Sequence, residues 1–316
     1  MDEFMPVKEA AKDRPLTRAQ IQRKVSLLRL LMALITKFKK TVGKEMFLNT
    51  GAGKVRVLAY NMDSPKKLPL FVNIHGGGFV IGNAEMDDPY LTNVAENANV
   101  KILNIDYSLS PDVMFPVALN ECYAVVKYAK EHSEELGIDG AKIAVGGHSA
   151  GGNLSAAICL LDAERKELGL KCVILDYPPL DVDTDPYMKP QPKGALNPKT
   201  CRAFNAAYCT KEEARNPLVS PAFATALQVE SFPPTLLITA EYDSLCEEGE
   251  KFGKMLKKAG VNITHKHFEA KHGFTCFGSD VTNSNAAWQM MIDHLKLHLH
   301  DSSGKENTGC VISTHN

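Results

Sequence analysis

From residue 54 onward, the sequence alternates short apolar runs with longer segments of helical periodicity. A repeated strand and helix pattern predicts an α/β protein, with a mostly parallel sheet covered by helices on both faces. The predicted strands are residues 54–60, 68–74, 100–106, 142–145, 172–176, 235–239 and 264–268. The predicted helices are residues 117–132, 153–167, 247–259 and 284–299.

Three segments do not follow this alternation. Residues 17–40, within the first 44 residues, have apolar side chains at helical spacing and predict an amphipathic helix packed on the main body at 45–300. Residues 181–220 begin with a proline-rich stretch and are expected to form an insertion over the sheet edge. Residues 301–316 are polar and are expected to be a flexible tail.

The charge balance argues against a nucleic-acid partner. The chain has 36 basic and 37 acidic side chains and a net charge of -1, so it lacks the basic surface that nucleic-acid binding requires. The first 44 residues carry +7 and the remainder -8. This basic start leaves contact of residues 17–40 with a membrane surface as an alternative to packing on the body.

The apolar run at 25–35 is interrupted by Arg29 and is shorter than the ~20 residues that a membrane span needs. It also lacks the cleavage site of a secretory signal. We therefore expect no transmembrane segment and a cytoplasmic protein. The eight cysteines have no C-x-x-C or other zinc-like spacing, which predicts reduced thiols and no metal site.

The pentapeptide G-H-S-A-G at residues 147–151 follows an apolar run and precedes a helical stretch. This order is what a nucleophile elbow requires, with Ser149 at the tip of a tight turn. Gly147 and Gly151 lack side chains and so allow the strand and the helix to approach each other. We predict that Ser149 is a nucleophile, and not part of an ordinary glycine-rich turn.

The sequence H-G-G-G at residues 75–78 ends another apolar run upstream of the elbow. Its unshielded N–H groups are typical of an oxyanion-hole loop, where each donor stabilises an acyl-transfer transition state by roughly 3–4 kcal/mol. The chain has no G-x-x-x-x-G-K-[ST], which argues against a phosphate loop. His75 and Gly76 are expected to support the loop. The predicted donors are the amides of Gly77, Gly78 and Ala150.

A serine nucleophile needs a histidine base, which in turn needs a carboxylate to orient it. With a nucleophile elbow, the chain order is serine, acid, histidine. Asp243 and His272 each follow a predicted strand, at the sheet edge where α/β proteins carry their sites. The alternatives that stay open are Glu241 and Glu247 for the acid, and His265 and His267 for the base.

Other histidines are weaker candidates. The side chain of His148 is adjacent to Ser149 on a tight turn and is expected to point away from the serine oxygen. His294, His298 and His300 lack an H-E-x-x-H pattern, so we interpret them as a solvated helix face and not as metal ligands.

Taken together, several blocks resemble the hormone-sensitive-lipase-like branch of the α/β hydrolases over roughly residues 68–275. They are residues 75–79 with Gly82, the Y-x-L-x-P run at 107–111 followed by 115–116, and residues 147–153, 243–245 and 272–274. The resemblance implies an α/β-hydrolase sheet of about eight strands, a Ser149–Asp243–His272 triad and no cofactor. It also implies a helical cap built from residues 1–44 and the insertion at about 181–220.

Three positions depart from the family pattern. His148 stands where an acid is usual before the nucleophile, Ser108 where an arginine is usual, and Asp112 where glutamate is more usual. These departures leave the triad intact, but they leave the subfamily and the substrate undefined.

We predict a serine carboxylesterase that cleaves short- to medium-chain acyl esters, small-molecule substrates, through an acyl-enzyme. An amidase or formamidase with the same triad is the main alternative. A small-molecule receptor of this fold is a further alternative. The plant hormone receptors that resemble this branch lack the triad histidine, so the presence of His272 argues against a receptor. A homodimer is left open.

Overall fold

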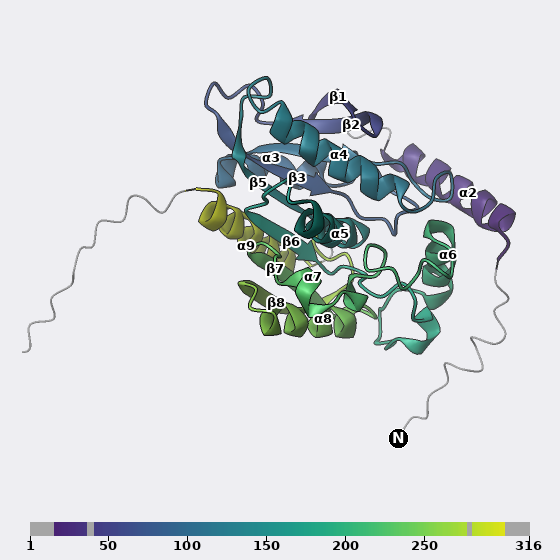
Figure 1. Cartoon of the computed structure of the whole chain (residues 1–316). Coiled ribbons are helices and arrows are strands. Elements are labelled where there is room, and N and C mark those ends of the chain that lie inside the picture. The colour runs from purple at the N-terminus through teal and green to yellow at the C-terminus, as the bar shows by residue number, and fades with distance from the viewer. Residues whose placement is uncertain (1–15, 37–40, 277–279, 301–316) are drawn as a thin grey trace, which may run out of the picture.

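The computed structural model describes residues 16–36, 41–276 and 280–300. These residues form one eight-stranded sheet in the spatial order β1-β2-β4-β3-β5-β6-β7-β8 (Figure 1). β1 is antiparallel to β2 and β2 to β4, whereas all later pairs are parallel. The predicted α/β class, with a mostly parallel sheet of about eight strands, is confirmed. The strands are β1 Lys44–Thr50, β2 Gly53–Tyr60, β3 Leu68–Ile74, β4 Lys101–Asp106, β5 Ile138–His148, β6 Cys172–Asp176, β7 Thr235–Tyr242 and β8 Ile263–Lys271.

Helices cover both faces of the sheet, as predicted. α4, α5 and α8 pack on one face, and α3 and α9 pack on the other (Figure 1). The helices are α2 Arg18–Thr36, α3 Asp88–Ala98, α4 Val117–Glu131, α5 Ala150–Arg165, α6 Pro198–Tyr208, α7 Ala226–Val229, α8 Cys246–Lys258 and α9 Val281–Leu299. Short 3-10 turns are η1 Ala84–Met86, η2 Pro186–Met188 and η3 Pro221–Phe223.

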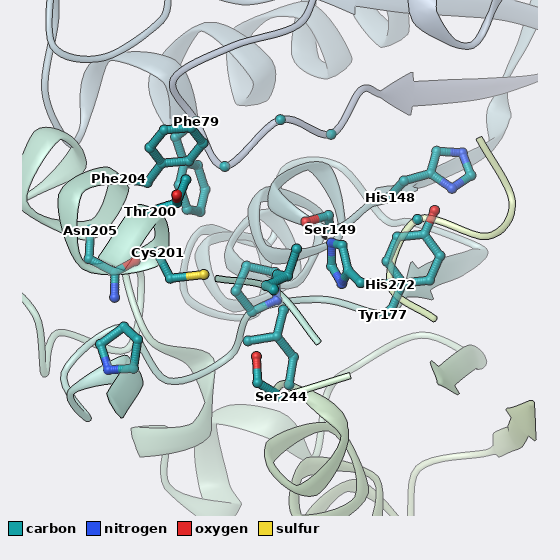
Figure 2. A pocket seen from close by; sticks show the side chains of 18 of the residues that line it. Phe79, His148, Ser149, Tyr177, Thr200, Cys201, Phe204, Asn205, Ser244 and His272 are labelled. Atoms are coloured by element: carbon teal, nitrogen blue, oxygen red, sulfur yellow. Dashed lines mark hydrogen bonds between the residues drawn. The ribbon is translucent and has the colours of Figure 1, made fainter. Parts of the chain in front are cut away.

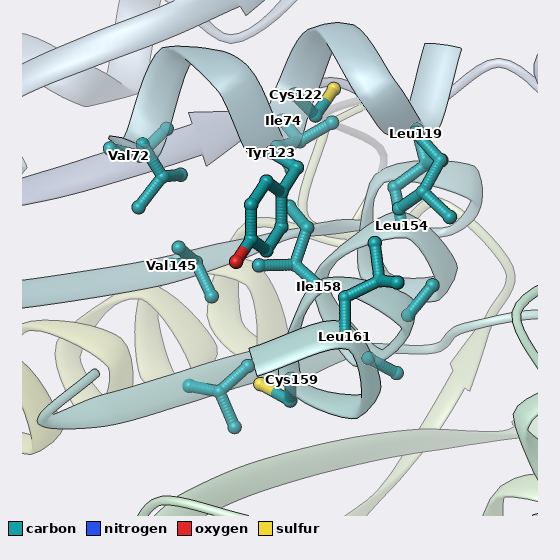
Figure 3. Packing of buried hydrophobic residues seen from close by; sticks show 14 of the residues in the cluster. Val72, Ile74, Leu119, Cys122, Tyr123, Val145, Leu154, Ile158, Cys159 and Leu161 are labelled. Atoms are coloured by element: carbon teal, nitrogen blue, oxygen red, sulfur yellow. The ribbon is translucent and has the colours of Figure 1, made fainter. Parts of the chain in front are cut away.

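The two faces are apolar because successive side chains of a strand point to opposite sides. On β3, Val72 belongs to the core under α4 and α5, whereas its neighbour Phe71 belongs to the core under α3 and α9. Strands buried on both faces appear in the sequence as continuous apolar runs, which is why β3 could be predicted. Figure 3 shows the first of these cores, where sheet residues meet α4 and α5; its labelled residues are Val72, Ile74, Val145, Leu119, Cys122, Tyr123, Leu154, Ile158, Cys159 and Leu161.

All seven predicted strands and all four predicted body helices are present, with shifts of a few residues at their ends. Four strands and helices were not predicted: β1, α3, α6 and the short α7. Only Leu48 of the seven residues in β1 is buried, so this edge strand has no apolar run to mark it. α6 lies in the proline-rich insertion, where Pro198 occupies the first turn and the side chain of Asn197 accepts a hydrogen bond from the Thr200 amide.

α2 docks on the body next to α6 (Figure 1). Ile21 and Val25 are buried against Val80 and Ala207. The guanidinium of Arg29 donates to the carbonyls of Val80 at 2.8 Å and Ser110 at 2.6 Å, and it pairs with Asp112. One apolar side of the helix is therefore packed, as expected, and one of its basic residues is used within the molecule.

None of the described helices is long and apolar enough to cross a membrane. The expected flexible tail at 301–316, like residues 1–15 and 37–40 of the expected cap, lies outside the described residues.

Candidate active site

Ser149 lies at the tip of a tight turn between β5 and α5. Its backbone has φ 52° and ψ -117°, a region that is rare for residues with a side chain and costs on the order of 1–3 kcal/mol. The turn leaves no room for side chains beside it, because a Cβ on Gly147 or Gly151 would lie 2.2 or 1.9 Å from the carbonyl oxygen of Ile74. The predicted elbow geometry is therefore present.

A chain of hydrogen bonds connects Ser149 to a carboxylate. The Ser149 hydroxyl lies 2.9 Å from Nε2 of His272, and Nδ1 of the same ring lies 2.6 Å from Oδ2 of Asp243. The other Asp243 oxygen accepts the Leu245 amide at 3.1 Å. With the Nδ1 proton donated to the carboxylate, Nε2 presents its lone pair to the serine hydroxyl, which is the arrangement a base needs.

The alternative acids and bases lie elsewhere. Glu241 and Glu247 are exposed, and Glu247 pairs with Lys251 on the next turn of α8. His265 and His267 are exposed on β8, and both bond to the hydroxyl of Thr239. Among the described residues, only Asp243 and His272 complete a hydrogen-bonded triad with Ser149.

The glycine loop after β3 faces Ser149. The amides of Gly77 and Gly78 donate to no acceptor within the described residues. Ala150 is the first residue of α5, where helical N–H groups have no partner in the helix. Gly77 adopts φ 113°, and a Cβ there would lie 1.9 Å from the Ile81 carbonyl oxygen. Only glycine fits this bend, which places the loop beside the serine.

His75 fixes the start of this loop. Its ring stacks on Tyr107 with centroids 4.3 Å apart, and its Nδ1 donates to the Gly76 carbonyl at 2.7 Å. Burial lowers the pKa of His75 below its ordinary value, which keeps the ring neutral. A neutral ring with its proton on Nδ1 holds the Gly76 carbonyl in place, which supports the position of the next two amides.

Ser149 and His272 face a cavity of about 280 Å³. Its walls are mostly apolar and come from the glycine loop, the start of the insertion and α6 (Figure 2). Its aromatic, aliphatic and sulfur-containing lining residues are Phe79, Ile81, Met86, Tyr177, Pro179, Val182, Pro186, Leu196, Cys201, Phe204, Leu245 and Cys276. Such walls accommodate an apolar ligand group and exclude water from the triad.

The α6 residues that form one side of this cavity were missed by the sequence analysis. Figure 2 shows Thr200, Cys201, Phe204 and Asn205 on one helix opposite Ser149. The available signal was Asn-Pro at 197–198, a helix start, which the proline content of the segment masked.

His148 points away from the serine oxygen, as expected (Figure 2). Its buried Nδ1 lies 2.6 Å from the carboxylate of Asp176, which also accepts the hydroxyl of Thr275 at 2.8 Å. Burial alone lowers the pKa of His148, but the charge of Asp87 and the hydrogen bond to Asp176 outweigh it and raise that pKa above its ordinary value. The charge of His148 thus balances the negative charge of the buried carboxylates of Asp87 and Asp176.

This raised pKa predicts a pH-dependent stability. Below the unfolded-state pKa of about 6.5, His148 is charged in both states and its contribution is complete. As the pH rises through the folded-state pKa, the contribution is lost, so the free energy of unfolding should fall. Urea unfolding between pH about 6 and about 8 should show this slope in the wild type and not in His148→Gln.

His267→Gln is the matched control, because it removes an exposed histidine and should keep the wild-type slope. Equal slopes in the wild type and His148→Gln would contradict a charged His148 in the folded protein.

Within the part of the chain that the structure describes, two groups of side chains have their potential ligand atoms close enough together to hold a metal ion. They are Asp87 with His148 and Cys276, and Cys246 with Glu250 and His267. His294, His298 and His300 belong to neither group, and the interpretation as a solvated helix face is wrong for His294, which is buried. Nε2 of His294 lies 3.3 Å from the Pro234 carbonyl and Nε2 of His300 lies 2.9 Å from the Ala98 carbonyl. The seven described cysteines are free thiols.

Comparison with known proteins identifies the family. A family model described as the alpha/beta hydrolase fold matches residues 71–276. The chain belongs to the α/β hydrolases. Within them it lies in the hormone-sensitive-lipase-like esterase branch, as the resemblance predicted.

This α/β hydrolase is 32% identical to "Carboxylic ester hydrolase LipN" of Mycobacterium tuberculosis, over 78% of this chain and 68% of that protein. It is also 32% identical to an arylesterase of Saccharolobus solfataricus, over 61% of this chain and 63% of that protein.

Solved structures agree with this placement. A thermostable esterase from Pseudomonas putida superposes with a TM-score of 0.81 at 27% identity, covering 88% of this chain and 91% of that one. An esterase from Pyrobaculum calidifontis gives a TM-score of 0.76 at 26% identity, covering 95% and 100%. The predicted fold, family and class of carboxylic ester hydrolase are confirmed.

Proposed function

We propose that this α/β hydrolase is a serine carboxylesterase that cleaves short- to medium-chain acyl esters through an acyl-enzyme at Ser149. The observation that carries the proposal is the continuous hydrogen-bond chain from Ser149 through His272 to Asp243 at an apolar cavity. Its esterase relatives support the activity class. The cavity supports the acyl-chain range.

The mechanism follows from the orientation of the groups. His272 takes the proton of the Ser149 hydroxyl as the oxygen attacks the ester carbonyl, and it then returns this proton to the leaving alcohol. Asp243 holds the imidazole and stabilises its charged form. Water, activated by the same histidine, then cleaves the acyl-enzyme and releases the acid.

The negative charge that develops on the carbonyl oxygen needs donors in fixed positions. We assign this role to the amides of Gly77, Gly78 and Ala150, since the loop and the start of α5 flank Ser149. Backbone donors aligned before the reaction need no rearrangement during it, and each is worth roughly 3–4 kcal/mol in the transition state.

A substrate panel tests the proposed activity. We expect nitrophenyl butyrate and hexanoate to be cleaved faster than palmitate, because the cavity of about 280 Å³ is small, and faster than the matching anilides and formamides. Preferred cleavage of an anilide or a formamide would instead assign the protein to the amidase class, and binding without turnover of any of them would indicate a receptor.

We further propose that α2 and α6 act as the cap of the site. α6 lines the cavity directly, whereas the described residues of α2 support the outer side of α6 and the loop at Val80. Deleting residues 1–40 should therefore raise KM for hexanoyl esters more than for acetyl esters. Each methylene that loses its buried contact costs ~0.8 kcal/mol, or about four-fold in kcat/KM. Initial rates on an acyl series measure this.

Contact with a membrane surface is the competing role for α2, because Leu27 and Leu30 are 59% and 58% exposed. That role predicts unchanged kinetics on soluble esters and loss of liposome co-sedimentation after the deletion. The double variant Leu27→Ser with Leu30→Ser separates the two roles, since it alters the exposed side and keeps Ile21 and Val25. An unchanged chain-length preference in the deletion variant would refute the cap role.

A further inference from the structure

A second apolar pocket lies behind the wall of the catalytic cavity. It has a volume of about 190 Å³ and lies between α2 and α6. Ile21, Val25 and Leu28 line it from α2, and Ala203 lines it from α6. We call it the rear pocket. None of the described α2 residues lines the catalytic cavity, so the two pockets are distinct.

Two residues of α6, Phe204 and Thr200, line both pockets. Phe204 is the larger of the two and only partly exposed. Its ring lies on the Gly78 side of the cavity, because a Cβ on Gly78 would come within 2.4 Å of the ring carbon Cδ2. Figure 2 shows the ring next to Phe79, on the side of the cavity opposite His272. The Phe204 ring thus forms a partition between the two pockets.

We infer that the rear pocket is a second acyl subsite, closed by Phe204, that receives the distal methylenes of a long-chain ester once the ring is moved or removed. This inference rests on the proposed function, since it gives the acyl chain a path beyond Ser149. Phe204 is then the residue that sets the chain-length limit of the enzyme.

The chemistry of the rear pocket fits an alkyl chain. Apart from Thr200 and two lysines, its lining is aliphatic or aromatic, and Ile21 and Val25 are buried among apolar neighbours. The two lysines in its lining, Lys24 and Lys199, are exposed, so their charged ends can stay in water while their alkyl stems contact the pocket. An apolar cavity of about 150 Å³ is enough to hold benzene, so the rear pocket has room for a terminal segment of about six carbons.

Replacing Phe204 by alanine should join the two pockets. Each methylene that enters the rear pocket should then raise kcat/KM about four-fold. We expect the ratio of kcat/KM for decanoyl over butyryl nitrophenyl esters to rise at least about ten-fold over the wild type. The ratio is the measured quantity because loss of the ring also removes a contact to the Gly78 loop, which can lower the rate on every ester.

Two further variants test the route of the chain. Phe204→Leu keeps most of the partition and should raise the ratio less than Phe204→Ala. Adding Ala203→Leu to Phe204→Ala places a side chain in the rear pocket, because Ala203 lines that pocket and not the catalytic cavity. This double variant should restore the wild-type ratio.

The outcomes separate the inference from the proposed function. Butyrate turnover with an unchanged decanoyl ratio in Phe204→Ala would overturn the subsite and leave the esterase assignment standing. A raised ratio that Ala203→Leu does not reverse would also overturn it, since the chain would then lie elsewhere. An absence of turnover on every ester by the wild type would refute the proposed function itself.

Discussion

Replacing Ser149 by alanine should lower kcat/KM for nitrophenyl butyrate by at least ~10³-fold while leaving the protein folded. The variant removes the oxygen that attacks the ester, so only binding and the oxyanion donors remain. It keeps the Cβ, and no hydrogen bond that holds the elbow depends on the hydroxyl, because the backbone amide of Ser149 donates to the Asp176 carbonyl at 2.8 Å. Steady-state rates and a thermal unfolding curve measure the two properties.

Ser155→Ala is the matched control for this prediction. Ser155 is a buried serine on α5, the helix that follows Ser149, and its hydroxyl donates to the Gly151 carbonyl at 2.8 Å without lining the cavity. Its loss should cost about 1 kcal/mol of stability and only a few-fold in rate. If Ser149→Ala retained wild-type turnover, the acyl-enzyme mechanism would be wrong.

The double variant Ser149→Ala with His272→Ala tests whether the two groups act together. His272 acts in two steps that both need the Ser149 oxygen, the attack on the ester and the hydrolysis of the acyl-enzyme formed on it. Its removal should therefore add little once that oxygen is gone. A double variant that is slower than Ser149→Ala by the full effect of His272→Ala would indicate that the histidine acts on another group.

The sequence predicted those elements of the fold that are buried on both sides. β3 and β6 are entirely buried, and their sequences are continuous apolar runs. β1 is an edge strand with one buried residue and could not be found in this way. Its pairing with β2 depends on backbone hydrogen bonds, which leave little mark on composition.

The triad could be predicted because its geometry depends on local signals. The elbow needs glycines at fixed positions, and the acid and the base follow strands whose carboxyl ends share one edge of the sheet. The cavity could not be predicted, because Phe204 and Thr200 reach it from an insertion whose position is determined by tertiary packing against α2 and the glycine loop.

The departure from the family at His148 is understandable only in three dimensions. The sequence shows a basic residue where an acid is usual, and the structure places this residue between the buried carboxylates of Asp87 and Asp176. The positive charge of His148 is therefore matched by two carboxylates that lie 28 and 61 positions away in the chain. No local sequence pattern connects these positions.

Replacing Gly151 by alanine should lower the free energy of unfolding by more than ~4 kcal/mol, the range reserved for severe steric or buried-charge defects. The added Cβ would lie 1.9 Å from the carbonyl oxygen and 2.6 Å from the carbonyl carbon of Ile74, and 2.8 Å from the carbonyl oxygen of His75. All three atoms belong to the backbone, so no side chain can rotate away. Either β3 or the start of α5 must move.

The same displacement should also abolish esterase activity in the molecules that still fold, because β3 leads into the glycine loop and α5 carries Ser149 at its start. Gly51→Ala is the matched control: Gly51 lies in the β1–β2 turn and a Cβ there meets nothing within 4 Å, so its unfolding free energy should stay within about 0.5 kcal/mol of the wild type. Urea unfolding of both variants decides the matter. Equal stability of the two variants would mean that β3 and α5 are not packed backbone to backbone at the elbow. It would also remove the physical reason for the strained backbone of Ser149.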